Sequence, residues 1–119
     1  MVSAQRRALA RLWRDRCTVY AREKRTDPRT QITRFEETPL LENQPCRLSF
    51  RQLRSTGGEE VAQAAQGAKL FLGAEFEIPA GCRVEVARGG RVHVFASSGT
   101  PGVFPSHQEI PLELWRGWA

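Results

Sequence analysis

The sequence predicts a mainly β protein: a small antiparallel β-barrel or sandwich with an N-terminal α-helix and one long loop. Three observations predict this class. From residue 17 onward, apolar and polar residues alternate with the period of two that is typical of half-buried strands. The alternating stretches are short and no crossover helix separates them, which favours antiparallel pairing. A Gly-Gly pair divides two such stretches within 82–95, as in a tight hairpin.

Charge divides the 119-residue chain into two parts. The net charge is +5, and residues 1–16 alone contain five arginines and one aspartate, which leaves residues 17–119 nearly neutral. We therefore expect a basic N-terminal helix or arm over 1–16 and a β-barrel domain over 17–119, with a mobile loop at 51–67. No apolar run is long enough to span a membrane, and the arginine-rich start lacks the features of a secretory signal.

The N-terminal helix is expected over residues 3–15, with Ser3 as its cap. On a helical wheel Leu9, Leu12 and Trp13 share one face, which we expect to pack against the barrel or a partner. Three arginines occupy the opposite face: Arg7, Arg11 and Arg14. They form a candidate basic contact surface for an anionic partner, and a plain solvated face is the alternative.

The strands are expected where the alternation is clearest, at 17–22, 31–37, 45–50, 68–73 (with 76–78 as a candidate extension), 82–87, 91–95 and 108–115. A turn at 25–30 contains Asp27-Pro28, and another lies at 78–81. Pro111 lacks a backbone donor, so the last strand should be an edge strand or an irregular one. The predicted core consists of Val19, Leu48, Val84, Val86, Val94 and Leu112.

The hairpin at 82–95 is expected to place four valines on one face: Val84, Val86, Val92 and Val94. That assignment puts His93 on the solvent side of its strand. His107 precedes the last strand and is expected to be an exposed or hydrogen-bonded surface histidine.

Catalytic chemistry is not supported by the motifs. The sequence contains no nucleophile elbow, no phosphate-binding glycine loop and no carboxylate pattern for a metal. We therefore expect no enzyme activity, no metal and no cofactor. Three cysteines lie far apart without a CxxC pair, which predicts buried reduced thiols in a reducing compartment: Cys17, Cys46 and Cys82.

The order and spacing of several sequence blocks are informative. Along the chain these blocks are RCTVY, PCRLSF, AKLFL, EIPAGCRVEV, SGTPGVFPSHQEIPLEL and the ending GWA. Together, over residues 16–119, they resemble the minor capsid or head-closure (stopper) proteins of long-tailed bacteriophages. The resemblance implies a β-barrel that forms a homo-oligomeric ring, a dodecamer, in the neck of the virion. Such a ring docks below the portal or an adaptor protein, retains packaged double-stranded DNA, and offers a surface to a tail-completion or tail-tube protein. The implied location is the head–tail interface, after assembly in the bacterial cytoplasm. In such a ring Arg7, Arg11 and Arg14 are the candidate contacts for DNA or for the portal.

The segment 51–67 fits neither the helical nor the strand period, and it is rich in Gly, Gln, Ala and Ser. Connections this long in a small β domain are usually functional or disordered. In the resembling proteins a long barrel loop lines or plugs the channel, so this segment is the candidate gate, with a floppy loop as the alternative. Its candidate gating residues are Gln52, Arg54, Gly57, Gly58, Glu59, Glu60, Gln63 and Gln66.

Tryptophans mark the candidate subunit interface: Trp13, Trp115 and Trp118. Tryptophan is enriched among interface anchors, and the alternative is that one or both of the C-terminal tryptophans fold back on the protein's own barrel. A second function also stays open, a small β-barrel nucleic-acid-binding module, because Tyr20 and Arg22 share a strand face, as do Arg47 and Arg51. Acidic residues are interleaved near both pairs.

The gate hypothesis gives a first prediction. Replacing residues 55–66 by a short Gly-Ser linker should leave the melting temperature nearly unchanged, because closure entropy depends weakly on loop length. Particles carrying the shortened protein should assemble but leak DNA, measured as DNase-sensitive genome. Particles that retain their genome normally would show that this loop is not the gate.

Overall fold

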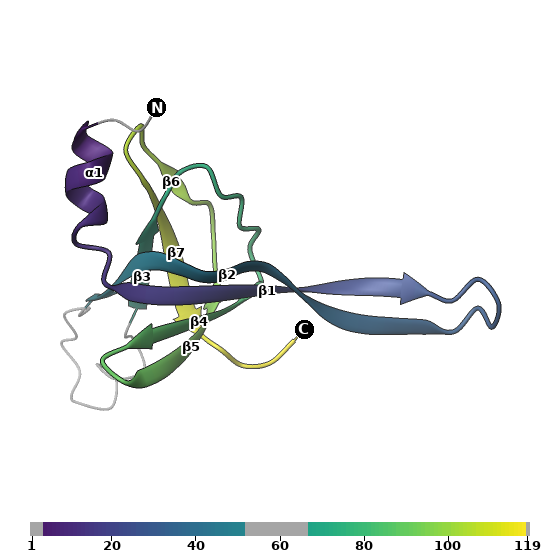
Figure 1. Ribbon diagram of the computed structural model, residues 1–119. Coiled ribbons are helices and arrows are strands. Elements are labelled where there is room, and N and C mark those ends of the chain that lie inside the picture. The colour runs from purple at the N-terminus through teal and green to yellow at the C-terminus, as the bar shows by residue number, and fades with distance from the viewer. Residues whose placement is uncertain (1–3, 52–66, 119) are drawn as a thin grey trace.

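The computed structural model describes residues 4–51 and 67–118 and shows a closed antiparallel sheet with a long hairpin projecting from it (Figure 1). The elements are α1 (Ala4–Ala10), β1 (Asp15–Thr26), β2 (Thr33–Arg51), β3 (Gly67–Leu72), β4 (Arg83–Arg88), β5 (Arg91–Ser97), β6 (Gly102–Val103) and β7 (Gln108–Leu114). The predicted class, mainly β with an N-terminal helix, is confirmed. All eight candidate gating residues, from Gln52 to Gln66, lie outside the described residues.

Barrel closure comes from the pairing of β3 with β7. The strand order is β3-β2-β1-β4-β5-β7-β6, and β3 also pairs with β7, so six strands form a ring with β6 beside it. Arg51 and Gly67, assigned to the loop by the sequence, are instead paired with each other at the ends of β2 and β3. β2 and β3 therefore extend to Arg51 and Gly67, and the segment between them is shorter than the predicted loop.

The core is built by the inward phase of each strand. Five of the six predicted core residues are buried, and Val94 is the exception: it is only half-buried. The three cysteines are buried and free, as predicted. Burial raises the pKa of the Cys82 thiol and so favours its neutral form. Leu70, Leu72 and Ile110 complete the fully buried set.

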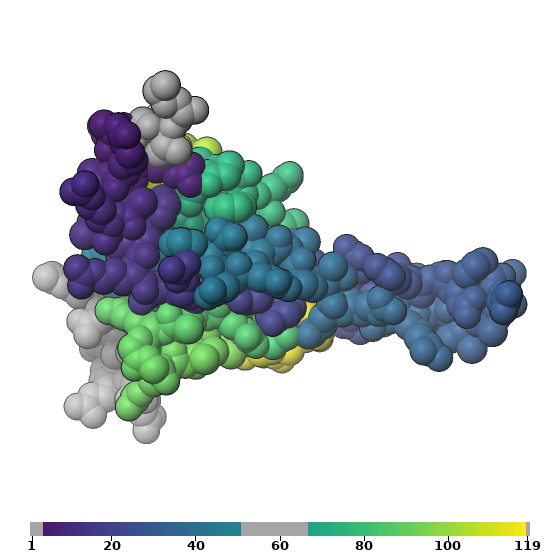
Figure 2. Space-filling model, viewed as in Figure 1, coloured from purple at the N-terminus to yellow at the C-terminus, as the bar shows by residue number. Residues whose placement is uncertain are grey.

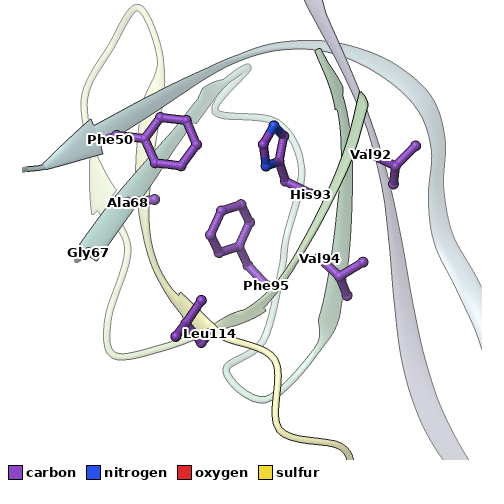
Figure 3. A pocket seen from close by; sticks show the side chains of 8 residues that line it. All are labelled: Phe50, Gly67, Ala68, Val92, His93, Val94, Phe95 and Leu114. Atoms are coloured by element: carbon purple, nitrogen blue, oxygen red, sulfur yellow. The ribbon is translucent and has the colours of Figure 1, made fainter. Parts of the chain in front are cut away.

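The predicted face of the β4–β5 hairpin was wrong for two of its four valines. Gly89 and Gly90 both have positive φ, as a two-residue type I′ turn requires. Such a turn pairs Arg88 with Arg91, and hence Val84 with Phe95 and Val86 with His93. Directly opposite residues share a face, so His93 and Phe95 face inward with the two β4 valines. Val92 and Val94 point the other way (Figure 3).

The strand bounds differ most from the predicted ones in the β1–β2 hairpin. The predicted strands 31–37 and 45–50 are one continuous strand, and β1 runs on to Thr26 instead of ending near residue 22. The register shifts twice along this pair, leaving Leu40 unpaired between residues that do pair, and Asn43 has positive φ. Bulges increase strand twist and bend a ribbon. Beyond them the hairpin leaves the barrel, as Figure 2 shows in space-filling view.

The N-terminal helix is shorter than predicted, with seven residues. A turn follows it, in which the Leu12 N–H donates to the Leu9 carbonyl at 2.9 Å. Because the helix ends at Ala10, Leu12 does not stay on the helix's apolar face and is 52% exposed, whereas Trp13 is buried. Ser3, the expected cap, lies outside the described residues.

The expectation for Pro111 was half right. β7 is not an edge strand, since it pairs with β3 along one side and with β6 and β5 along the other. On that second side the partner changes between residues 109 and 112, and the Pro111 carbonyl accepts the Ser98 N–H at 2.9 Å. In an antiparallel strand the N and O of one residue face the same side. The missing proline N–H therefore falls in this irregular gap.

Truncating the core should be costly while truncating the hairpin should not. Leu70 is fully buried, so Leu70→Ala should lower the free energy of unfolding by about 2–5 kcal/mol, measured by urea denaturation. The matched control is Leu40→Ala, which removes the same atoms from an exposed bulge and should cost well under half as much. Equal losses would contradict this account of the core.

Candidate assembly surfaces

One end of the barrel is open and aromatic. We call the side chains of Phe50, His93, Phe95 and Leu114 the barrel mouth. They line a pocket of about 440 Å³ (Figure 3). These side chains belong to the inward-facing residues of β2, β5 and β7, at the end of the barrel. The Phe50 and His93 rings meet edge to face at 5.5 Å, and the rings of Phe50 and Phe95 are 6.2 Å apart.

The barrel mouth leaves large apolar side chains exposed. Phe50 is 46% exposed and Leu114 is 54% exposed, with Val92 on the neighbouring outer face at 63%. A concave apolar surface of this kind is typical of a site that another chain covers. The alternation of the sequence places Phe50 and Leu114 in phase with the buried Leu48 and Leu112, and alternation alone does not show where the core ends along a strand.

An arginine-lined pocket of about 450 Å³ adjoins the barrel mouth at Phe50. Arg14, Arg47 and Arg88 line it, with the buried Asp15 at its wall. Asp15 Oδ2 accepts the Leu48 N–H at 2.8 Å, and Arg88 Nη1 donates to the Leu48 carbonyl at 3.1 Å.

The three N-terminal arginines proposed as a set are separated by the fold. All three are exposed, as predicted, but Arg14 lies by the arginine-lined pocket, while Arg7 is on α1 and Arg11 follows it. α1 itself is held to the barrel by Arg6, whose guanidinium forms a bidentate ion pair with Glu75. Whether Arg7, Arg11 and Arg14 contact DNA or a portal stays a prediction.

The C-terminal tryptophans pack against each other and against the base of the hairpin. The rings of Trp115 and Trp118 meet edge to face at 4.8 Å, and both side chains are half-buried. Trp118 Nε1 donates to Glu37 Oε1 at 2.8 Å. Trp118 thus contacts its own chain at Glu37, and the role of the C-terminal pair in a subunit interface stays a prediction.

Arg83 completes the base of the hairpin. Its Nη2 donates to Glu37 Oε2 at 2.7 Å and its Nη1 to Glu85 at 2.5 Å. Its guanidinium also lies 4.4 Å from the centre of the Tyr20 ring, a cation–π contact. The Arg83 side chain is only 20% exposed, so these partners hold β1, β2 and β4 together where the hairpin leaves the barrel.

We call residues 22–37 the arm. Every residue of the arm is exposed. In the described part of the chain its two strands pair only with each other, because β4 pairs with β1 only as far as Tyr20. Arg22 lies over the Phe35 ring at 3.9 Å, and Arg25 pairs with Glu36 at 3.2 Å. The sequence predicted the turn at 25–30 and a strand at 31–37 but not the arm as a whole, because the charged residues of 22–26 do not alternate with apolar ones.

His107 joins β6, β7 and β3. Its ring stacks on Phe104 at 4.9 Å and on Phe71 at 5.9 Å. Its Nδ1 lies 3.0 Å from Ser106 Oγ and its Nε2 lies 3.1 Å from Glu109 Oε2. The bond from His107, with Lys69 assisting, lowers the pKa of Glu109. The predicted hydrogen-bonded surface histidine is confirmed, and these contacts fasten the β6–β7 turn.

Within the described ranges, no cluster of three histidine, cysteine or acidic side chains could hold a metal ion. No helix in the described part of the chain is long and apolar enough to cross a membrane.

Comparison with known proteins gives one informative likeness. No protein-family profile matches the sequence, and no curated protein matches it. The fold is similar to a solved structure, the phage-like element PBSX protein xkdH from Bacillus subtilis, with a TM-score of 0.50 and 10% sequence identity. The match covers 83% of this chain and 91% of that chain. At this identity, the likeness shows a shared fold.

The tryptophan contact at the arm's base gives a testable prediction. Trp118→Phe keeps an aromatic ring beside Trp115 but removes the N–H donated to Glu37, so we expect a loss of about 1 kcal/mol in urea denaturation. Amide hydrogen exchange should accelerate in residues 33–39. Trp115→Phe is the control and should leave exchange in the arm unchanged. This role of the Trp118 hydrogen bond is refuted if both variants loosen the arm equally.

Proposed function

We propose that this chain is a structural protein of a phage or prophage virion, a head-closure protein that forms a ring below the portal. In this role the ring retains packaged double-stranded DNA and presents a surface for tail attachment. The protein works by assembly, without catalysis or cofactor.

The observation that carries the proposal is the fold. The barrel matches a protein of a phage-like element over most of both chains. The sequence blocks that resemble head-closure proteins fall on the strands that build this barrel, among them PCRLSF on β2 and EIPLEL on β7. Fold likeness and block resemblance are separate lines of support, because at 10% identity the shared fold owes little to shared residues.

The surfaces suit a subunit that is covered by neighbours. The barrel mouth is concave and apolar, with Phe50 and Leu114 about half exposed, and the arm extends away from the body (Figures 1 and 2). An isolated two-stranded ribbon is marginally stable in water, so contacts in an assembly would help to hold it. The expected partners are further copies of this chain in a twelve-membered ring, a portal or adaptor protein, and a tail-completion or tail-tube protein.

Deletion of the gene from the phage or prophage that encodes it tests the proposal. Heads should package DNA and then lose it, and tails should stay unattached, because the missing ring both closes the channel and offers the docking surface. Electron microscopy would show emptied heads beside free tails, and the released genome would be sensitive to DNase.

Supplying the intact gene from a plasmid is the control and should restore tailed, DNA-filled particles. Two outcomes contradict the proposal. Tailed infectious particles at normal yield would show that the protein is dispensable for closure, and heads that never package DNA would place its action earlier in assembly.

A further inference from the structure

The distal half of the arm is a basic β-ribbon in which cationic side chains outnumber acidic ones. We call residues 24–34 the arm tip. It contains Lys24, Arg25, Arg29 and Arg34 against a single acid, Asp27, for a net charge of +3. We propose that the arm tip binds duplex DNA along its phosphate backbone, through Arg25, Arg29 and Arg34. All three arginines are exposed on the ribbon or its turn.

Like charges face each other across the ribbon. Arg25 on β1 is paired directly with Arg34 on β2, an arrangement that destabilises a strand pair. The nearest carboxylate, Glu36, contacts Arg25 Nε at 3.2 Å. Among the described residues, the side chain of Arg34 has no hydrogen-bond or ion-pair partner. A bound anion between the two arginines would turn this repulsion into attraction.

The geometry provides a place for that anion. Arg25 and Arg34 line an open pocket of about 310 Å³ near the hairpin turn, with Thr26, Asp27, Ile32 and Glu36. Asp27 is engaged elsewhere, because its Oδ1 accepts the Arg29 N–H at 2.8 Å. The same bond fixes the turn that carries the Arg29 side chain.

The shape of the ribbon fits a duplex. Five residue pairs, from Arg22–Glu37 to Thr26–Thr33, lie beyond the barrel. At about 3.3 Å per residue they carry the turn about 15 Å from the body. The major groove of B-DNA admits a two-stranded ribbon, and arginine forks suit phosphate oxygens.

An acidic protein surface is the competing anion, and the composition of the arm tip disfavours it. Protein interfaces are anchored by large aromatic side chains, and the arm tip has none. Phe35, just outside it, already carries the Arg22 guanidinium on its face. Ile32 is the one large apolar side chain of the arm tip.

The inference deepens the proposed function, and it rests on that function for the presence of duplex DNA beside the chain. It assigns DNA contact to the arm, whereas the sequence pointed to the N-terminal arginines. Those residues supply a matched control, because Arg7, Arg11 and Arg14 are also three exposed arginines.

The experiment measures binding of a fluorescent duplex of about 20 base pairs by anisotropy over a range of salt concentrations. The full chain should bind at low salt. The triple variant Arg25→Gln, Arg29→Gln, Arg34→Gln should lose at least tenfold in affinity. The slope of log K against log[salt] should flatten by about 0.9 for each phosphate that the variant no longer neutralises. The control triple variant Arg7→Gln, Arg11→Gln, Arg14→Gln should lose less than threefold.

Three further measurements keep the result interpretable. Thermal melting checks that both glutamine variants fold. The triple variant Arg25→Lys, Arg29→Lys, Arg34→Lys keeps the charge and should keep most of the salt slope. Poly-glutamate is the probe for an acidic protein and should compete poorly for the arm.

The inference is overturned by full-strength binding of the arm variant, by an equal loss in the N-terminal control, by no binding of the unaltered chain at low salt, or by poly-glutamate displacing the duplex at matched charge. Failure of the proposed function looks different. In that case DNA affinity would depend on the arm in solution, while deletion of the gene would leave heads filled and tailed.

Discussion

Closure of the sheet by the β3–β7 pair is the constraint on which the rest of the structure depends. Once six strands form a ring, every strand must direct one phase of side chains inward. β1 loses its second neighbour after Tyr20, where β4 begins. β2 has β3 beside it only from Arg47 onward. Beyond Tyr20 and its partner Pro39 the two long strands soon pair only with each other, and residues 22–37 leave the barrel as the arm. The projection therefore follows from unequal strand lengths around a closed ring.

The same closure decides which side chains become surface. At one end of the barrel the inward-facing residues of β2, β5 and β7 extend beyond the packed core, and Phe50 and Leu114 are about half exposed around a pocket. At the other end the bulge at Leu40 bends the hairpin outward, and Arg83 with Glu37 and Trp118 ties its base to the barrel and to the C-terminal segment. A protein built in this way presents an apolar concave end and a charged arm, two surfaces suited to different neighbours.

These two surfaces are the physical basis of the head-closure proposal, because each is suited to a different kind of partner. An apolar mouth gains stability from burial against another protein, since that removes aromatic surface from water. A basic ribbon gains from counterion release on a polyanion and loses that gain in salt. Contacts between subunits and contact with DNA therefore depend on different residues and respond differently to ionic strength, which allows the two roles to be separated by substitution.

The sequence by itself determined the class of fold, because alternation, the Gly89-Gly90 turn and short strand spacing are local properties of the chain. It also determined most of the core, from Val19 to Leu112. The length of the turn also predicts the register of the β4–β5 hairpin. A two-residue turn at 89–90 places an odd-numbered residue opposite Val84, so Val92 and Val94 cannot share the face of Val84. Only the tertiary structure decided where the core stops and the arm begins. Both depend on which strands lie beside each other. The local sequence does not show the pairing of strands that are far apart along the chain, such as β3 and β7.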